Sequence, residues 1–172
     1  TYQLTDENEL KIHYEAICDK TTVIGLTNHS YFNLKGAGEG LIHDHFLQLN
    51  ADFHTALDEF TCPTGEILKV DNSPYDFRHP VLLGERINDP VYASNRGLDD
   101  NWVIRKNQPG ELALAGYIYE PDSGRKMEVI TTQPGVQVYT ANWVDKQTAK
   151  YGKEHNAQGA ICLETQGFPA SP

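Results

Sequence analysis

Apolar and polar residues alternate along most of this chain, which is the period of a strand that buries one face. Residues 9–18 show the pattern first, with Leu10, Ile12 and Tyr14 in an apolar row and mostly polar side chains between them. The sequence contains no apolar i, i+3, i+4, i+7 pattern of helix length, and a parallel sheet would need crossover helices. The pattern therefore predicts an all-β chain folded as an antiparallel β-sandwich.

Turn residues separate the expected strands at short intervals. Strands are expected over residues 1–4, 9–18, 21–27, 45–52, 102–104, 112–119, 126–132, 135–143 and 160–164. Residues 120–125 should form the turn of the clearest hairpin, and residues 63–65 (Pro-Thr-Gly) a further turn. Residues 72–90, which contain several prolines, are expected to be a surface excursion with one helical turn near 81–85. Residues 144–158 are expected to be a polar loop.

Length and charge narrow the class of protein. A chain of 172 residues can bury a substantial core, so we expect a single domain over residues 1–172. The 24 acidic residues against 14 basic ones give a net charge of −10. This balance argues against a nucleic-acid partner, because such partners are held by clustered cations. No apolar run reaches the roughly 18 residues that a spanning helix needs, so we also expect no membrane association.

The cysteines bear on the cellular compartment. Cys18, Cys62 and Cys162 are odd in number and widely spaced, and they include no C-x-x-C pair. Neither a disulfide framework nor a zinc knuckle is indicated. A reducing, cytoplasmic setting fits this usage.

The stretch TNHSYFNL, residues 27–34, concentrates side chains that can carry chemistry. His29 lies at the far end of an expected strand, beside Asn28, Tyr31 and Asn33. A histidine, with a reference pKa of about 6.5, can donate or accept a proton at neutral pH. A buried histidine whose ring is bonded to backbone groups fits the same residues. The local sequence leaves both interpretations open.

A second candidate, Glu164, lies near the other end of the chain at the tip of an apolar run. Strand alternation should place it on the same face as Cys162 and Ala160. A carboxylate in an apolar strand is costly to bury unless it is paired or raised in pKa, and a raised pKa makes a carboxylate a useful base. A salt bridge or a strand-edge position is the commoner explanation. The decisive question is whether His29 and Glu164 face each other.

Other clusters give weaker signals. Asp99 and Asp100 follow a glycine, which is typical of turn chemistry, and they lack the residue order of a calcium loop. The run His43-Asp44-His45 has no further ligand of matching spacing, so it is weak support for a metal.

The motifs exclude several enzyme classes, and the side chains present favour a sugar as the ligand. The chain has no G-x-S-x-G, P-loop or G-x-G-x-x-G pattern, which sets aside serine hydrolases, P-loop enzymes and dinucleotide binding. An acid, a base and many hydrogen-bonding side chains on a β-sandwich point instead to a small sugar. Aromatic rings bind the apolar faces of sugars, and Asn, Gln and Asp bind their hydroxyls.

Five motifs in order resemble those of one known family. They are TNHSYFNLKG, PTGEI, NRGLDDNW, TTQPGVQVYTANW and CLETQ, and they cover nearly the whole chain. Together they resemble the aldose 1-epimerases, the galactose mutarotases. The resemblance implies a large antiparallel β-sandwich that interconverts the α and β anomers of aldohexoses such as galactose and glucose, with neither cofactor nor metal.

The resemblance also implies roles for individual residues. His29 in TNHSYFNL matches the acid that protonates the ring oxygen, and Glu164 in CLETQ matches the base that takes the proton of the C1 hydroxyl. Asp99 in GLDDN and Gln137 in GVQVY match residues that bind the sugar. An acid and a base around one pocket suffice for ring opening and closure.

Family members are considerably longer than this chain. The resemblance therefore implies a carboxyl-terminal portion, without the Asn-Arg pair and second histidine of the family's upstream half. Asp100 and Asn101 fall where the family varies and receive no role. A hexose-phosphate epimerase of the same fold and a non-catalytic sugar-binding sandwich stay open as alternatives.

Overall fold

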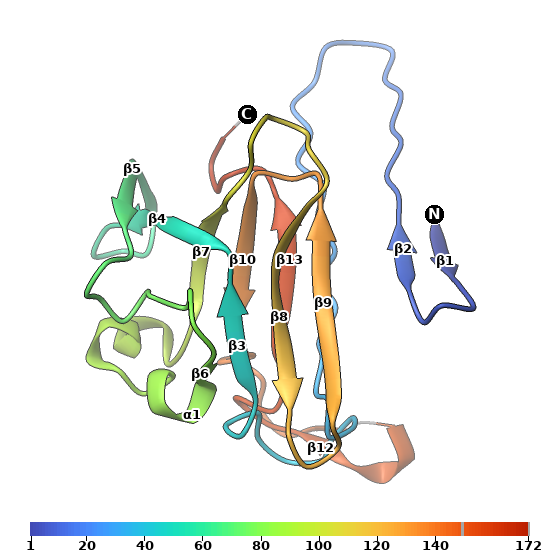
Figure 1. Cartoon of the computed structure of the whole chain (residues 1–172), viewed down its shortest axis with the longest axis vertical. Helices are drawn as coiled ribbons and strands as arrows, with labels where there is room; N and C mark the ends of the chain where they lie inside the picture. Colours follow the sequence, from blue (N-terminus) through green and yellow to red (C-terminus); the bar gives the residue numbers. More distant parts are fainter. Residues whose placement is uncertain (149, 172) are drawn as a thin grey trace.

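The computed structural model describes residues 1–148 and 150–171, and it consists mainly of antiparallel strands (Figure 1). The strands of the two larger sheets are β3 (Phe46–Leu49), β4 (Ala51–Leu57), β5 (Pro63–Lys69), β6 (Val81–Leu82), β7 (Asp99–Ile104), β8 (Ala113–Glu120), β9 (Arg125–Thr131), β10 (Gly135–Tyr139) and β13 (Cys162–Gln166). One sheet has the order β13-β10-β7-β4-β5 and the other the order β6-β3-β8-β9. The expectation of an all-β antiparallel fold is confirmed.

The two larger sheets bury one shared apolar cluster, which makes them a sandwich. Leu47 and Ile118 come from the four-stranded sheet, and Trp102 and Val138 from the five-stranded sheet. Because side chains alternate along a strand, the residues between these core positions face away from the cluster. The outward face of β13, β10 and β7 is therefore free to carry a site.

The hairpin expected around residues 120–125 is present. β8 and β9 pair from Ala113↔Thr131 to Glu120↔Arg125. The Glu120 carboxylate accepts hydrogen bonds from the N–H groups of Asp122 (3.1 Å) and Ser123 (2.7 Å), which stabilises the turn. β1 (Tyr2–Leu4) and β2 (Leu10–Ile12) form a second hairpin that stands apart from the sandwich in Figure 1. That the whole chain is one domain stays a prediction.

The expected strand over residues 21–27 is wrong. Residues 13–31 have no strand, and the strand expected over 9–18 is limited to Leu10–Ile12. Val23 and Ile24 have the β-branched side chains of a strand, yet they are 73% and 55% exposed. A strand needs a neighbour to bond its backbone groups, and within the described residues this segment has no strand partner. Its apolar pattern alone is not enough.

The turn expected at residues 63–65 is also wrong. Pro63–Lys69 is β5, at the edge of the five-stranded sheet, where a proline at the first position costs no ladder hydrogen bond. The turn lies just before it, where the Asp58 carboxylate accepts from the N–H groups of Phe60 (2.8 Å) and Cys62 (2.9 Å). The aspartate at position 58, which is typical of an Asx turn, was thus a better indicator of the turn than the proline and glycine of residues 63–65.

Residues 72–90 are more than a surface excursion, so that expectation is wrong as well. Phe77 and Leu83 are buried in the core cluster, and the Leu49 N–H donates to the Phe77 carbonyl (2.7 Å). The expected helical turn is present as α1 (Leu83–Arg86).

Short elements complete the described part of the chain. They are the 3₁₀ helices η1 (Pro90–Asn95) and η2 (Lys150–Gly152) and the two-residue strands β11 (Gln147–Thr148) and β12 (Glu154–His155). The last three lie in the region expected to be a polar loop. Over residues 1–148 and 150–171, no helix has the length and apolarity needed to cross a membrane.

Candidate active site

Three neighbouring strands form the floor of a pocket on the outward face of the five-stranded sheet. In the antiparallel register, Gln137 of β10 lies between Glu164 of β13 and Asn101 of β7. In the same way, Tyr139 lies between Cys162 and Asp99. The strand alternation of the sequence therefore places the expected base and both expected sugar-binding residues on one surface.

His29 reaches this surface from the strandless segment 13–31. The segment is held along the edge of β13, because Phe32 and Ile161 exchange two backbone hydrogen bonds of 2.9 Å. The Thr27 hydroxyl also donates to the Thr165 carbonyl (3.3 Å). These contacts place His29 beside the strand that carries Glu164.

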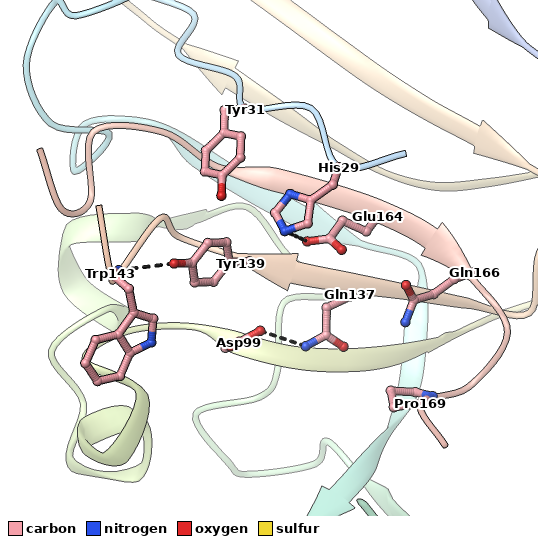
Figure 2. A pocket seen from close by; sticks show the side chains of 9 residues that line it. All are labelled: His29, Tyr31, Asp99, Gln137, Tyr139, Trp143, Glu164, Gln166 and Pro169. Atoms are coloured by element: carbon pink, nitrogen blue, oxygen red, sulfur yellow. Dashed lines mark hydrogen bonds and ion pairs between the residues drawn. The ribbon is translucent and has the colours of Figure 1, made fainter. Parts of the chain in front are cut away.

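The structure brings His29 and Glu164 together. The Nε2 atom of His29 lies 3.3 Å from Oε1 of Glu164 (Figure 2). The His29 side chain is about half exposed, whereas that of Glu164 is 9% exposed. Burial raises the pKa of Glu164, His29 opposes the rise, and the charge of Asp99 adds to it. A buried carboxylate with a raised pKa next to an accessible imidazole is an arrangement suited to proton transfer.

The pocket has a volume of about 440 Å³, which lies within the range of small-molecule sites, about 300–1,000 Å³. Its lining, drawn in Figure 2, consists of His29, Tyr31, Asp99, Gln137, Tyr139, Trp143, Glu164, Gln166 and Pro169. All four residues proposed from the sequence are among them. The lining combines hydrogen-bonding side chains with aromatic rings.

Asp99 and Gln137 are joined on the pocket floor. The Gln137 Nε2 donates to Asp99 Oδ1 at 2.9 Å. Gln137 Oε1 is buried and has no hydrogen-bond partner among the described residues. Asp99 is not a turn residue, because it lies in β7 and its neighbour Asp100 faces the opposite side of the sheet.

Aromatic side chains form the wall above the floor. Tyr31 stacks on His29 with ring centroids 5.1 Å apart, and Tyr139 meets His29 edge-on at 5.9 Å. The Trp143 backbone N–H donates to the Tyr139 hydroxyl (3.1 Å), and the Arg96 guanidinium lies 4.4 Å from the Trp143 ring centroid. Such rings are a platform for the apolar face of a sugar.

Sequence reasoning assigned no role to several of these residues. Tyr139, Trp143 and Gln166 stand in the motifs YTANW and LETQ, but nothing local showed that they share a pocket. Sequence reasoning also assigned no role to Asn101. Its side chain is 1% exposed, lies next to Gln137 in the register, and has no hydrogen-bond partner among the described residues.

The residues that could hold a metal are not those of the His43-Asp44-His45 run. The His43 ring lies 2.6 Å from Gln158 Oε1, Asp44 pairs with Lys35 (2.6 Å), and His45 Nε2 accepts from the Leu34 N–H (3.0 Å). A set of three possible donors lies instead at the pocket, where His29 and Glu164 are part of the lining and Cys162 is buried beside them. The ligand atoms of His29, Cys162 and Glu164 are all within 4.8 Å of one another.

Comparison with known proteins places the chain among sugar epimerases. A family model described as aldose 1-epimerase matches residues 1–172. The galactose mutarotase of Mus musculus is 41% identical over 172 residues, and that of Sus scrofa is 40% identical over 170 residues. These alignments cover 99% and 98% of this chain and 48% of each relative, so the chain spans about half the length of the curated relatives it matches.

A solved structure agrees with this placement. An aldose epimerase homologue from C. elegans superposes with a TM-score of 0.72 at 29% sequence identity. The superposition covers 86% of this chain and 43% of that structure.

Proposed function

This chain belongs to the aldose 1-epimerase family, and on that premise we propose that the protein interconverts the α and β anomers of aldohexoses such as galactose and glucose. The observation that carries the proposal is the 3.3 Å approach of His29 Nε2 to Glu164 Oε1 in a pocket lined by aromatic and hydrogen-bonding side chains. The small-molecule partner is a neutral sugar. The wide spacing and free state of the three cysteines support a cytoplasmic location.

The proposed reaction moves two protons around one carbon. Glu164 takes the proton of the C1 hydroxyl while His29 delivers a proton to the ring oxygen, and the bond between C1 and the ring oxygen breaks. Rotation about the C1–C2 bond turns the other face of the aldehyde toward the C5 hydroxyl. Ring closure then reverses both transfers. Both oxygens are bonded to C1, so an acid and a base that approach each other so closely can serve them together.

The surroundings support these assignments. Burial raises the pKa of Glu164, which makes its carboxylate a stronger base than an exposed glutamate. Asp99 accepts hydrogen bonds from sugar hydroxyls, and the Gln137 amide that donates to Asp99 holds the carboxylate in place. The rings of Tyr31 and Tyr139 pack beside His29 and limit its orientation.

A neutral sugar is better supported than a hexose phosphate. In the described part of the chain no lysine or arginine lines the pocket, whereas two carboxylates do. The neighbouring Arg96 is stacked on Trp143, and Arg78 is paired with Asp52, Asp71 and Asp76. A phosphate group would meet net negative charge. Rates on glucose and on glucose 6-phosphate would separate the two substrates.

Polarimetry on freshly dissolved α-D-galactose and α-D-glucose tests the proposal, with protein produced from the complete reading frame. Wild-type protein should speed the decay to equilibrium. Glu164→Gln should lose about 10²–10⁴-fold of this activity, the usual contribution of one acid–base group. The exposed Glu128→Gln is the matched control and should behave as wild type.

Two outcomes would contradict the proposal. A decay with wild-type protein that equals the spontaneous rate would exclude mutarotation. If sugar binding persisted in that case, and also in His29→Ala, the protein would be a sugar-binding module.

A further inference from the structure

Cys162 carries a thiol, a possible metal ligand, that has no role in the proposed epimerase reaction. It lies in β13 two residues before Glu164, so both side chains are on the pocket face of the sheet. The residue is fully buried and its thiol is not paired in a disulfide. It packs with Tyr139, Ala141 and Ala160, where a small apolar residue would fill the space equally well.

The donor set around Cys162 matches the preferences of zinc. Zn²⁺ binds imidazole nitrogen, thiolate sulfur and carboxylate oxygen in a tetrahedral geometry, with bond lengths of about 2.0–2.3 Å. In such a site the nitrogen and oxygen ligands are about 3.4 Å apart, a distance that follows from those bond lengths. The His29 Nε2 to Glu164 Oε1 distance is 3.3 Å. Two of the three donors are thus already spaced as zinc ligands.

The third donor is within reach of the same ion. One ligand atom of each of the three residues lies within 4.8 Å of the other two, so closures of up to about 1 Å complete a zinc triad. His29 can supply its part of this movement, because it lies on the strandless segment 13–31 and is about half exposed, and rotation of the Glu164 side chain can bring its carboxylate toward the sulfur. Pairing of β13 with β10 fixes the backbone of Cys162 and Glu164.

We propose that His29, Cys162 and Glu164 form an inhibitory Zn²⁺ site, in which the ion takes one ligand atom from each residue and a water from the pocket as its fourth ligand. As the bond between zinc and sulfur forms, the thiol proton is released to solvent. The charges of the thiolate and the carboxylate balance the ion. Bound zinc occupies both proton-transfer groups, so it prevents the proposed sugar chemistry. Only this inhibition rests on the proposed function, whereas metal binding does not.

Cobalt(II) titration tests the site without any activity measurement. Co²⁺ takes the same ligands as zinc, and a cobalt–thiolate bond gives a charge-transfer absorption band. Wild-type protein, kept reduced in a non-chelating buffer, should show this band and lose it when Zn²⁺ is added. Cys162→Ser should lack the band and bind Zn²⁺ more than about tenfold more weakly, whereas the exposed Cys62→Ser should match wild type.

Two further measurements complete the test. Glu164→Gln keeps the thiol but loses the carboxylate, so its Zn²⁺ affinity should also fall, even if Cys162→Ser does not fold. In polarimetry, Zn²⁺ should inhibit wild type and Cys62→Ser, and a chelator should restore both. Absence of the thiolate band in wild type, or its persistence in Cys162→Ser, would overturn the proposal. If the band is present but no mutarotation is found, the metal site stands and the proposed function fails.

Discussion

The buried charge of Asp100 should lower the free energy of unfolding at neutral pH, and replacement by asparagine should restore it. The side chain is 4% exposed on the core side of β7, and burial raises its pKa to about 6. The Asp99 N–H, which donates to Asp100 Oδ2 at 3.3 Å, opposes this rise, and the Asp99 charge adds to it. Asparagine has nearly the same shape, keeps an oxygen acceptor and carries no charge.

The pKa difference sets the size and the sign of the effect. The reference pKa of an aspartate is 3.8, so the folded state raises it by about 2 units, and each unit corresponds to 1.36 kcal/mol. Between pH 3.8 and about 6 the folded protein retains a proton that the unfolded chain releases. The retained proton stabilises the folded state. This stabilisation is fully present below pH 3.8 and is lost as the pH rises through about 6. Above that pH, Asp100→Asn should be more stable than wild type by up to about 3 kcal/mol.

Urea unfolding of wild type and Asp100→Asn at several pH values from 4 to 8 measures this difference. The gap between the two free energies of unfolding should widen with pH and level off above about pH 7. The exposed Asp145→Asn is the control and should show no such trend. A gap that stays constant from pH 4 to 8, or a variant that is less stable at pH 8, would refute the assignment of burial as the dominant cause.

The remaining predictions concern the pocket and its floor. If Glu164 is the base, kcat/KM for mutarotation should fall on the acid side with a midpoint above the ordinary glutamate pKa of 4.5, because burial raises the pKa of this carboxyl and only its ionised form accepts a proton. A midpoint at or below 4.5 would contradict this role. Gly135→Ala should lower the free energy of unfolding by about 1–3 kcal/mol, because its Cβ would lie 2.6 Å from Asn101 Oδ1 and 3.2 Å from Phe168. Gly25→Ala, which meets nothing within 4 Å, is the matched control, and equal urea midpoints for the two variants would contradict the packing argument.

The strand pattern predicted much of the sandwich because each prediction needed only local information. The β8–β9 hairpin follows from two alternating runs around a polar turn. The alternation in β10 correctly separates Val136 and Val138, which face the core, from Gln137 and Tyr139, which face the pocket. These features depend on neighbours in the chain, and so the sequence alone carries them.

The failures occurred where a segment's conformation depends on distant partners. Residues 21–27 have strand composition but, among the described residues, no strand to pair with. Pro63 lies in a strand because it occupies the first position of an edge strand, and edge or centre is a property of the whole sheet. Phe77 is buried because the sandwich lies beneath it, although its sequence neighbourhood is polar.

The sequence by itself determined which side chains share a strand face, and its motifs identified His29, Asp99, Gln137 and Glu164 as candidates. Only the tertiary structure decided that these residues meet, because the order β13-β10-β7 and the register between the strands arise from long-range pairing. The Phe32–Ile161 bridge is a further long-range contact, and it holds His29 3.3 Å from Glu164 and close to Cys162. Contacts between residues far apart in the chain depend on how sheets pack, and no local pattern records that packing.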